Sequence, residues 1–177
     1  ASIVCIGKSN NNGAKGADGT MSEAWPQGIF SARLIKALAR TGAVASGKKF
    51  DPDQVQPASL DLRLGEKALR VRSSFLPGPE KTVAERVENL KLHEIDLTKG
   101  AVLERGCVYI VPLLESLDLP KEVAAAANPK SSTGRLDIFT RVITDSARSF
   151  DTVPAGYKGP LYLEISPRTF PVLVRTG

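Results

Sequence analysis

The sequence has little cysteine, a single histidine and no long apolar run, and each shortage excludes a class of protein. Its 177 residues include two cysteines, Cys5 and Cys107, and one histidine, His93. Two cysteines this far apart do not make the disulfide framework of a small secreted domain. No uninterrupted apolar stretch reaches the roughly 18 residues that a membrane-spanning helix needs. We therefore expect a soluble, cytoplasmic protein with no membrane partner.

Aromatic residues are also scarce, at 6% of the chain, whereas the net charge is +5. This charge is compatible with an ordinary basic surface and with an anionic ligand such as a nucleotide. Proteins that bind single-stranded nucleic acid combine basic residues with stacking aromatic side chains, and the sequence has no such cluster. We therefore predict no nucleic-acid partner.

Residues 1–20 differ in composition from the rest of the chain. Ala1–Gly7 is apolar, whereas Lys8–Thr20 is small and polar and lacks the G-x-x-x-x-G-K-[ST] spacing of a phosphate-binding loop. We expect residues 1–20 to be a disordered upstream extension or an expression remnant. The folded domain is then expected to occupy residues 21–177.

The domain has one clear helical pattern and many short strand patterns. Ser31–Arg40 has apolar residues at helical spacing, and Gly42 follows as a typical helix terminator. Beyond it, Pro and Gly separate short apolar or alternating segments, which predict strands. These segments are 59–64, 68–71, 101–103, 108–113, 138–144, 161–165 and 172–174. The pattern predicts a mainly β barrel or sandwich, with 85–92 either a helical turn or a loop.

The segment Lys130–Arg135, which reads KSSTGR, is the first candidate for binding a ligand. Serine hydroxyls can donate to phosphate oxygens, and an arginine adds a two-pronged charged donor. Gly134 would let the backbone pass close to a ligand. The same composition is also typical of a polar turn between strands, and the residues alone leave both interpretations open.

The second candidate is Glu164, which interrupts the apolar segment Leu161–Ile165. If its face of the strand is buried, the carboxylate needs partners and is suited to proton transfer; otherwise that face is exposed to solvent. A turn-rich stretch, Phe150–Gly159, precedes this strand. In it, Asp151 is either a turn residue or a contact for a sugar hydroxyl, and Asp145 is a competing candidate for that contact.

Three motifs occur in the order seen in dCTP deaminases of the dUTPase-like superfamily. They are Gln56–Gly65, Lys130–Arg135, and Gly156–Gly159 followed by Leu163-Glu164. The chain resembles the longer bacterial form of this family, in which a second related half follows the first. The resemblance implies a mainly β, dUTPase-like distorted barrel (β-clip) with one N-terminal helix, and active sites between the subunits of a trimer or pseudo-trimer. It also implies a domain truncated at its C-terminal end.

The resemblance further implies zinc-independent hydrolytic deamination of dCTP to dUTP and ammonia, with Glu164 as catalytic base and acid. The substrate-binding residues that it implies are Lys130, Ser131, Ser132, Arg135 and Asp151. Mg²⁺ would arrive on the triphosphate, and no metal site of the protein is implied. Zinc deaminases need a His/Cys set such as H-x-E with P-C-x-x-C. One histidine and two separated cysteines cannot supply that set.

Two alternatives remain open at this stage. A dUTP diphosphatase, or an enzyme with both activities, would need an aspartate to activate water at the α-phosphate, and Asp151 is available for that role. A non-catalytic nucleotide-binding fragment is the other alternative. The chain also departs from the family pattern, because Lys130 stands where an arginine is usual and the hairpin after Asp151 is longer.

Overall fold

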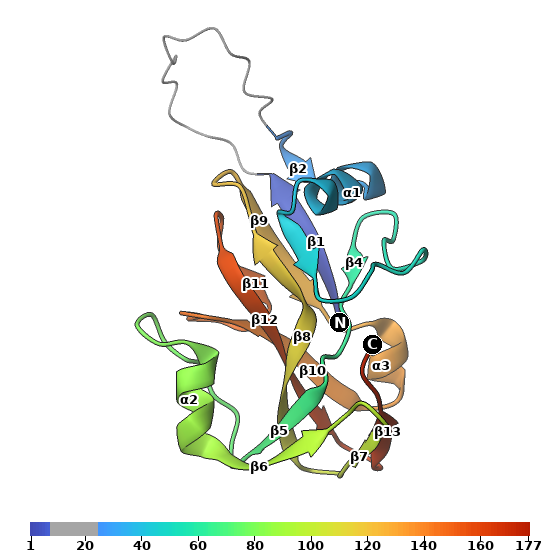
Figure 1. The fold of residues 1–177 in the computed structure, drawn as a ribbon, viewed down its shortest axis with the longest axis vertical. Coiled ribbons are helices and arrows are strands. Elements are labelled where there is room, and N and C mark those ends of the chain that lie inside the picture. Colours follow the sequence, from blue (N-terminus) through green and yellow to red (C-terminus); the bar gives the residue numbers. More distant parts are fainter. Residues whose placement is uncertain (8–24) are drawn as a thin grey trace, which may run out of the picture.

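The computed structural model describes residues 1–7 and 25–177, and in them the chain is mainly antiparallel β-sheet with three helices (Figure 1). This confirms the mainly β prediction. The strands form two larger sheets and a two-stranded ribbon. A closed barrel requires the two edge strands of a sheet to pair with each other. Within the described residues both larger sheets keep free edges, so the distorted barrel expected from the resemblance is open.

The first sheet has the strand order β11-β9-β1-β2, and β4 also pairs with β1. These strands are β1 (Ser2–Gly7), β2 (Gly28–Ile29), β4 (Leu60–Asp61), β9 (Val123–Asn128) and β11 (Thr152–Val153). Strand β1 pairs with β9 along its whole length and buries Ile3 and Cys5. Residues 1–7 are therefore not part of a disordered extension, because their alternating side chains give a strand one buried face. Residues 8–20 lie outside the described residues.

The second sheet has the order β10-β12-β8-β5-β6, and β3 also pairs with β8. Its strands are β3 (Val44–Ser46), β5 (Lys67–Val71), β6 (Lys91–Asp96), β8 (Val108–Asp118), β10 (Ile138–Thr144) and β12 (Lys158–Pro167). The ribbon joins β7 (Ala101–Leu103) to β13 (Val172–Val174). All strand pairs are antiparallel, and β12 lies between β10 and β8, so both of its edges are hydrogen-bonded.

Helix α1 (Ala32–Arg40) is the helix that the sequence predicts. Gly42 follows it with a φ of +82°, the left-handed conformation that favours glycine at this place. Ser31 holds the N-cap position, but its side chain makes no capping hydrogen bond. The carbonyl of Pro57 instead accepts a hydrogen bond from Ala32 N at 2.7 Å, so a neighbouring loop satisfies the start of the helix.

Two further helices are present, α2 (Val83–Leu90) and α3 (Ser131–Arg135). The first occupies most of the segment whose state the sequence left undecided. It begins with a capping box, in which Thr82 Oγ1 accepts from Glu85 N at 3.2 Å and the Glu85 carboxylate accepts from Thr82 N at 2.7 Å. No helix in residues 1–7 and 25–177 is long and apolar enough to cross a membrane.

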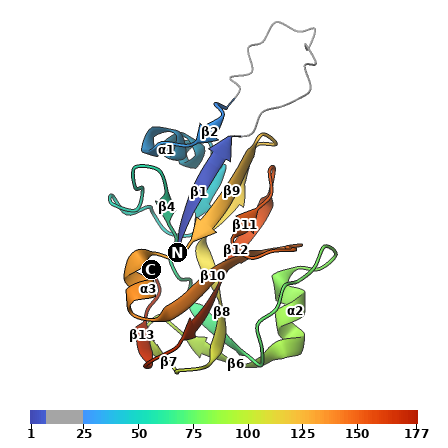
Figure 2. The ribbon, with the colours of Figure 1, turned by 180° about the vertical axis from the view of Figure 1, so that it is seen from behind.

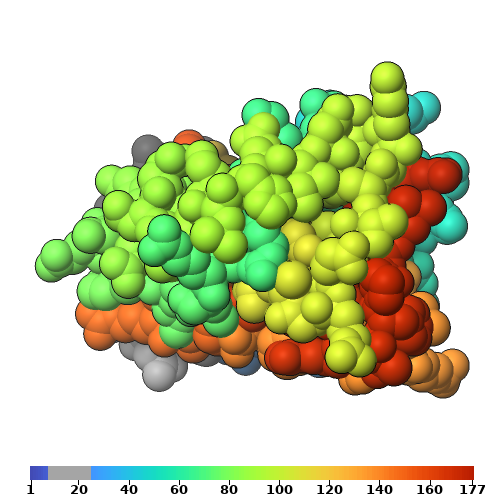
Figure 3. Space-filling view, turned by 90° about the horizontal axis from the view of Figure 1, so that it is seen from below, coloured from blue at the N-terminus to red at the C-terminus, as the bar shows by residue number. Residues whose placement is uncertain are grey.

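Two apolar cores lie on opposite faces of the second sheet. The main core packs Leu161 and Leu163 of β12 against the first sheet, whereas the smaller core packs Ile143 of β10 against α2. Helices α2 and α3 lie on opposite sides of the molecule (Figures 1 and 2). Seen from below, α2 and β6 cover much of one face (Figure 3). Both faces of β12 are therefore covered from Leu163 to Pro167, so a polar side chain in this part of the strand is enclosed by protein.

Candidate active site

Glu164 is the predicted catalytic residue, and it lies in the middle of β12. In the two flanking strands its partners are Arg141 of β10 and Ile110 of β8. Because directly paired residues share a face of a sheet, Glu164 and Arg141 both point toward the side that α2 covers. Glu164 is 2% exposed, so its carboxylate is buried rather than on a solvated face of the sheet.

Both carboxylate oxygens of Glu164 have hydrogen-bond partners. Arg141 Nε donates to Oε1 at 3.0 Å, and Ser74 Oγ donates to Oε2 at 2.6 Å. Arg141 Nη2 also donates to Ser74 Oγ at 2.7 Å, so the three side chains form a closed ring. The Arg141 guanidinium lies over the ring of Phe150, 3.5 Å from its centroid. A carboxylate removed from water needs such a cation and donors to remain charged.

Asp151 lies close to this pair in space. Its φ is +58°, and its carboxylate accepts a hydrogen bond from Val142 N at 2.7 Å. Burial raises the pKa of Asp151, against the lowering effects of the Val142 hydrogen bond and the Arg141 charge, and the negative charge of Glu164 adds to the increase. Asp151 is thus within electrostatic reach of both Arg141 and Glu164.

Asp145, the competing candidate, has a structural contact. Its carboxylate accepts a hydrogen bond from Val83 N, the first residue of α2, at 2.7 Å. A carboxylate at a helix N-terminus satisfies one of the free backbone donors there and interacts favourably with the helix dipole. Asp145 therefore joins the end of β10 to the start of α2.

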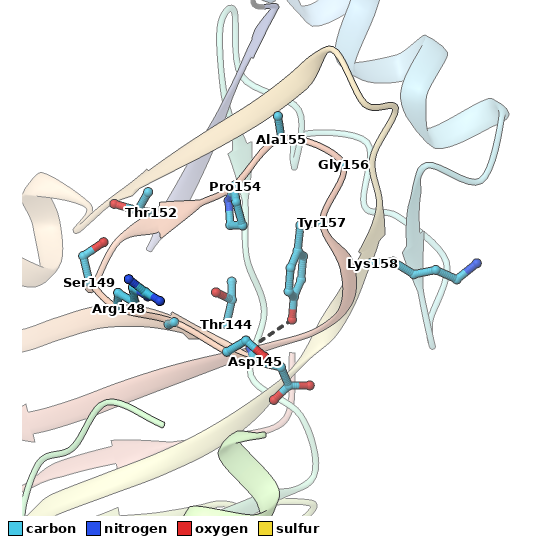
Figure 4. A pocket seen from close by; sticks show the side chains of 12 residues that line it. Thr144, Asp145, Arg148, Ser149, Thr152, Pro154, Ala155, Gly156, Tyr157 and Lys158 are labelled. Carbon is cyan, nitrogen blue, oxygen red and sulfur yellow. Dashed lines mark hydrogen bonds between the residues drawn. The ribbon is translucent and has the colours of Figure 1, made fainter. Parts of the chain in front are cut away.

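A cavity of about 520 Å³ lies beside the hairpin that precedes β12 (Figure 4). Its walls are residues 144–149, 152 and 154–158. The Tyr157 hydroxyl accepts from Asp145 N at 3.1 Å, and burial raises the pKa of Tyr157 to about 12, so this hydroxyl stays neutral. Thr144 Oγ1 is buried without a partner among the described residues. The cavity has a mixed polar and apolar lining, and Glu164 is not among the residues that line it.

The KSSTGR segment forms α3, with Lys130 at its N-cap position. Ser131, Ser132 and Arg135 are exposed, and no hydrogen bond or ion pair in the described residues links them to Glu164. Lys130 is ion-paired with Asp61 of β4. Burial alone would raise the pKa of Asp61, but hydrogen bonds from Lys130 and Ser2 lower it overall.

The predicted residues thus fall into two groups in one chain. Glu164 and Asp151 lie near each other, whereas Lys130 and Ser131 line a separate pocket of about 410 Å³ together with Asp61. The residues from 1–7 and 25–177 contain no group of three or more His, Cys, Asp or Glu side chains placed to hold a metal ion.

Sequence reasoning missed Arg141 and Ser74. Arg141 had a signal, because it interrupts the apolar segment Ile138–Thr144 as Glu164 interrupts the next strand. Two opposite charges in adjacent predicted strands are a candidate buried pair. Ser74 had none, because it lies in an irregular loop that only the folded chain brings over β12.

Residues 26–177 match the family model of the 2′-deoxycytidine 5′-triphosphate deaminase N-terminal domain. The dCTP deaminase of Halorubrum lacusprofundi is 35% identical over 152 residues, which cover 84% of this chain and 71% of that protein. The "dCTP deaminase, dUMP-forming" of Beutenbergia cavernae is 31% identical over 150 residues, or 84% of this chain and 74% of that one.

A solved structure agrees with these relatives. The crystal structure of the 2′-deoxycytidine 5′-triphosphate deaminase from Agrobacterium tumefaciens is 64% identical, with a TM-score of 0.81, and covers 84% of this chain. This chain spans 44% of the length of that protein. By the matched domain, the relatives and the fold, the chain belongs to the 2′-deoxycytidine 5′-triphosphate deaminase family.

Proposed function

We propose that this chain is part of an enzyme that hydrolyses dCTP to dUTP and ammonia, with Glu164 as general base and then general acid. The observation that carries the proposal is the burial of Glu164 in the middle of β12, with a cation and a hydroxyl bound to its two oxygens. A positioned carboxylate of this kind is suited to proton transfer. The family to which the chain belongs supplies the substrate class.

The reaction needs both protons of the water to move. As the water oxygen bonds to C4 of cytosine, the C4=N3 electron pair moves to N3, and Glu164 takes one water proton and passes it to N3, which gives a tetrahedral intermediate with a hydroxyl and an amine on C4. Glu164 then takes the proton of that hydroxyl and passes it to the amine, so that the C4–N bond breaks, C4=O forms and ammonia leaves. The products are dUTP and ammonia from dCTP and water, so a single carboxylate can serve both steps.

We assign triphosphate binding to Lys130, Ser131, Ser132 and Arg135. Hydroxyls and cations at an exposed helical turn suit phosphate oxygens. Mg²⁺ would enter as part of the nucleotide, where it neutralises phosphate charge. Asp151 is the proposed contact for the deoxyribose hydroxyl, because it lies close enough to Glu164 to interact with its charge. Asp145 is not chosen, because its carboxylate already accepts a hydrogen bond from the first residue of α2.

We also propose a homo-oligomer, either a trimer or a pseudo-trimer, because no hydrogen bond or ion pair within the described residues of one chain links the exposed residues of α3 to Glu164. In such an assembly the phosphate-binding residues of one subunit would complete the site around Glu164 of another. We expect sedimentation of the full-length protein to give a homo-oligomer and not a monomer. A monomer that turns over dCTP at the full rate would contradict this part of the proposal.

The decisive experiment compares the Glu164→Gln variant of the full-length protein with the full-length wild type, in assays that detect ammonia, dUTP and pyrophosphate. The amide keeps the shape of the side chain but cannot take the proton, so we expect turnover to fall by about 10²–10⁴-fold. Binding of dCTP should persist. Glu94→Gln, an exposed carboxylate on β6 paired with Lys67, is the matched control.

Unchanged turnover in Glu164→Gln would refute the assigned role. Pyrophosphate without ammonia would identify a diphosphatase and refute the deaminase proposal. Ammonia together with pyrophosphate would indicate the dUMP-forming activity that the name of the Beutenbergia cavernae relative describes. Nucleotide binding with no product would leave the chain a binding module.

A further inference from the structure

We propose that Arg141 is a positioning residue for the Glu164 carboxylate. It binds Oε1, so that Oε2 is the oxygen that takes the proton of the attacking water. This inference rests on the proposed role of Glu164. It concerns a residue that donates a hydrogen bond to that carboxylate.

The surroundings of Glu164 offer it few other polar partners. The smaller apolar core, which includes Ile110 and Ile143, packs on the face of the sheet where Glu164 lies. Apart from Ser74, Arg141 is the one side chain that donates to this carboxylate among the described residues. Without Arg141, Glu164 would be a nearly buried charge with a single neutral donor, which is unfavourable.

Arg141 is itself held in place. Its guanidinium lies 3.5 Å from the ring centroid of Phe150 and 5.0 Å from that of Phe139, and the side chain is 25% exposed. Cation–π contacts of this kind fix a guanidinium while leaving its edges free for hydrogen bonds. One edge supplies Nε to Glu164 and Nη2 to Ser74.

This geometry distinguishes the two oxygens of Glu164. Oε1 is bound to Arg141 from within the sheet, whereas Oε2 accepts from Ser74, an exposed residue of the loop that follows β5. The Ser74 hydroxyl donates to Oε2 and accepts from Arg141, which is the same pair of hydrogen bonds that a water molecule would make there. Oε2 is therefore the oxygen that a reacting water can reach once Ser74 moves aside.

A lysine at position 141 would keep the charge but not the geometry. Arginine presents its donors in a rigid fork, whereas lysine places a single ammonium at the end of a flexible stem. We therefore expect Arg141→Lys to retain part of the function and Arg141→Gln to retain less. An effect on orientation alone should lower kcat and leave KM for dCTP within about twofold, because such an effect acts on the reacting carboxylate and not on substrate binding.

The experiment measures kcat and KM for Arg141→Gln and Arg141→Lys in the full-length protein. We expect Arg141→Gln to lower kcat by about 10–100-fold, which is the loss of one hydrogen bond to a charged group and is less than the effect of Glu164→Gln. Arg141→Lys should lower kcat by a smaller factor, because it keeps the charge.

Two further variants serve as a control for loss of a nearby cation and as an independent test of how Arg141 is held. Arg168→Gln removes a cation that stacks on Phe139 at 5.2 Å without contacting Glu164, and it should leave kcat unchanged. Phe150→Leu leaves the charge but removes the supporting ring, so it should lower kcat in the same direction by a smaller factor. It replaces Arg141→Gln if that variant does not fold.

The outcomes separate this inference from the proposed function. An unaltered kcat in Arg141→Gln, or a rise in KM alone, would overturn the positioning role while Glu164→Gln remained inactive. Equal losses of kcat in Arg141→Gln and Arg141→Lys, accompanied by a rise in KM, would show a merely structural role. Full activity of Glu164→Gln would instead remove the proposed function itself.

Discussion

Replacing Arg63 with methionine should strongly destabilise the fold, because it leaves a buried carboxylate without its cation. The side chain of Glu115 is 0% exposed and accepts hydrogen bonds from Gln54 Nε2 at 2.8 Å, Arg63 N at 2.8 Å and Arg63 Nε at 2.9 Å. The Arg63 side chain is 9% exposed and also donates to Asp51 and Ser46. The pair therefore joins the segment between β4 and β5 to β8, and Arg63 also binds the loop after β3.

The magnitude follows from the burial of the pair. Removing one partner of a buried ion pair costs about 3–5 kcal/mol, because the remaining charge is unpaired. For a chain of this size, such a loss lowers the melting temperature by about 6–20 °C. Methionine occupies much of the space of the arginine stem, so most of the loss should come from the charge. The double variant Arg63→Met/Glu115→Leu should recover a large part of it.

Urea unfolding followed by circular dichroism, on both single variants and the double variant, gives the coupling free energy of the pair. Lys67→Met, which breaks an exposed pair with Glu94, is the control and should leave the midpoint unchanged. If Arg63→Met shifts the midpoint no more than Lys67→Met does, the reasoning is wrong. A double variant no more stable than Arg63→Met would refute the claim that the unpaired charge causes the loss.

Burial raises the pKa of Cys5 to about 11, so in a Cys107→Ser variant a thiol reagent should react at neutral pH only after unfolding. Rapid reaction of the native protein would contradict a buried β1. The folded-state pKa of Asp61 lies below its usual 3.8, so its stabilisation is complete above that pH and is lost as the pH falls through the lowered value. Acid titration should therefore show the stability difference from Asp61→Asn shrinking below pH 3.8. Thr82→Ala removes the cap of α2 and should lower the free energy of unfolding by about 1 kcal/mol in urea titrations.

The strands that the sequence predicts best are those rich in β-branched or aromatic residues. β7, β10 and β13 have the predicted bounds, and β8 and β12 extend beyond them. Strand β9 was missed because it reads VAAAAN, and alanine has a low strand propensity and gives no alternating pattern. It is a strand because β1 and β11 pair with its two edges, and tertiary contacts of this kind do not register in a local pattern.

From the sequence alone, the buried part of the candidate site could be recognised only where a charged residue interrupts an apolar strand pattern. Glu164 and Arg141 each interrupt an apolar strand, but only their register shows that they meet. The position of Ser74 depends on how its loop crosses the sheet, which no spacing in the sequence encodes. The role of Lys130 as an ion-pair partner of Asp61 was equally hidden, because the two residues lie 69 positions apart.

The two buried glutamates show how a structural carboxylate differs from a candidate catalytic one. Glu115 and Glu164 are almost equally inaccessible, and each is paired with an arginine, so burial and charge do not separate them. Their partners do. All donors to Glu115 come from buried residues, so displacing any of them would leave a polar group unsatisfied in the core. One donor to Glu164 is Ser74 on an exposed loop, which water can satisfy when it leaves. A carboxylate that can exchange a protein hydroxyl for a water molecule, while an arginine keeps it charged, has the property that hydrolysis requires.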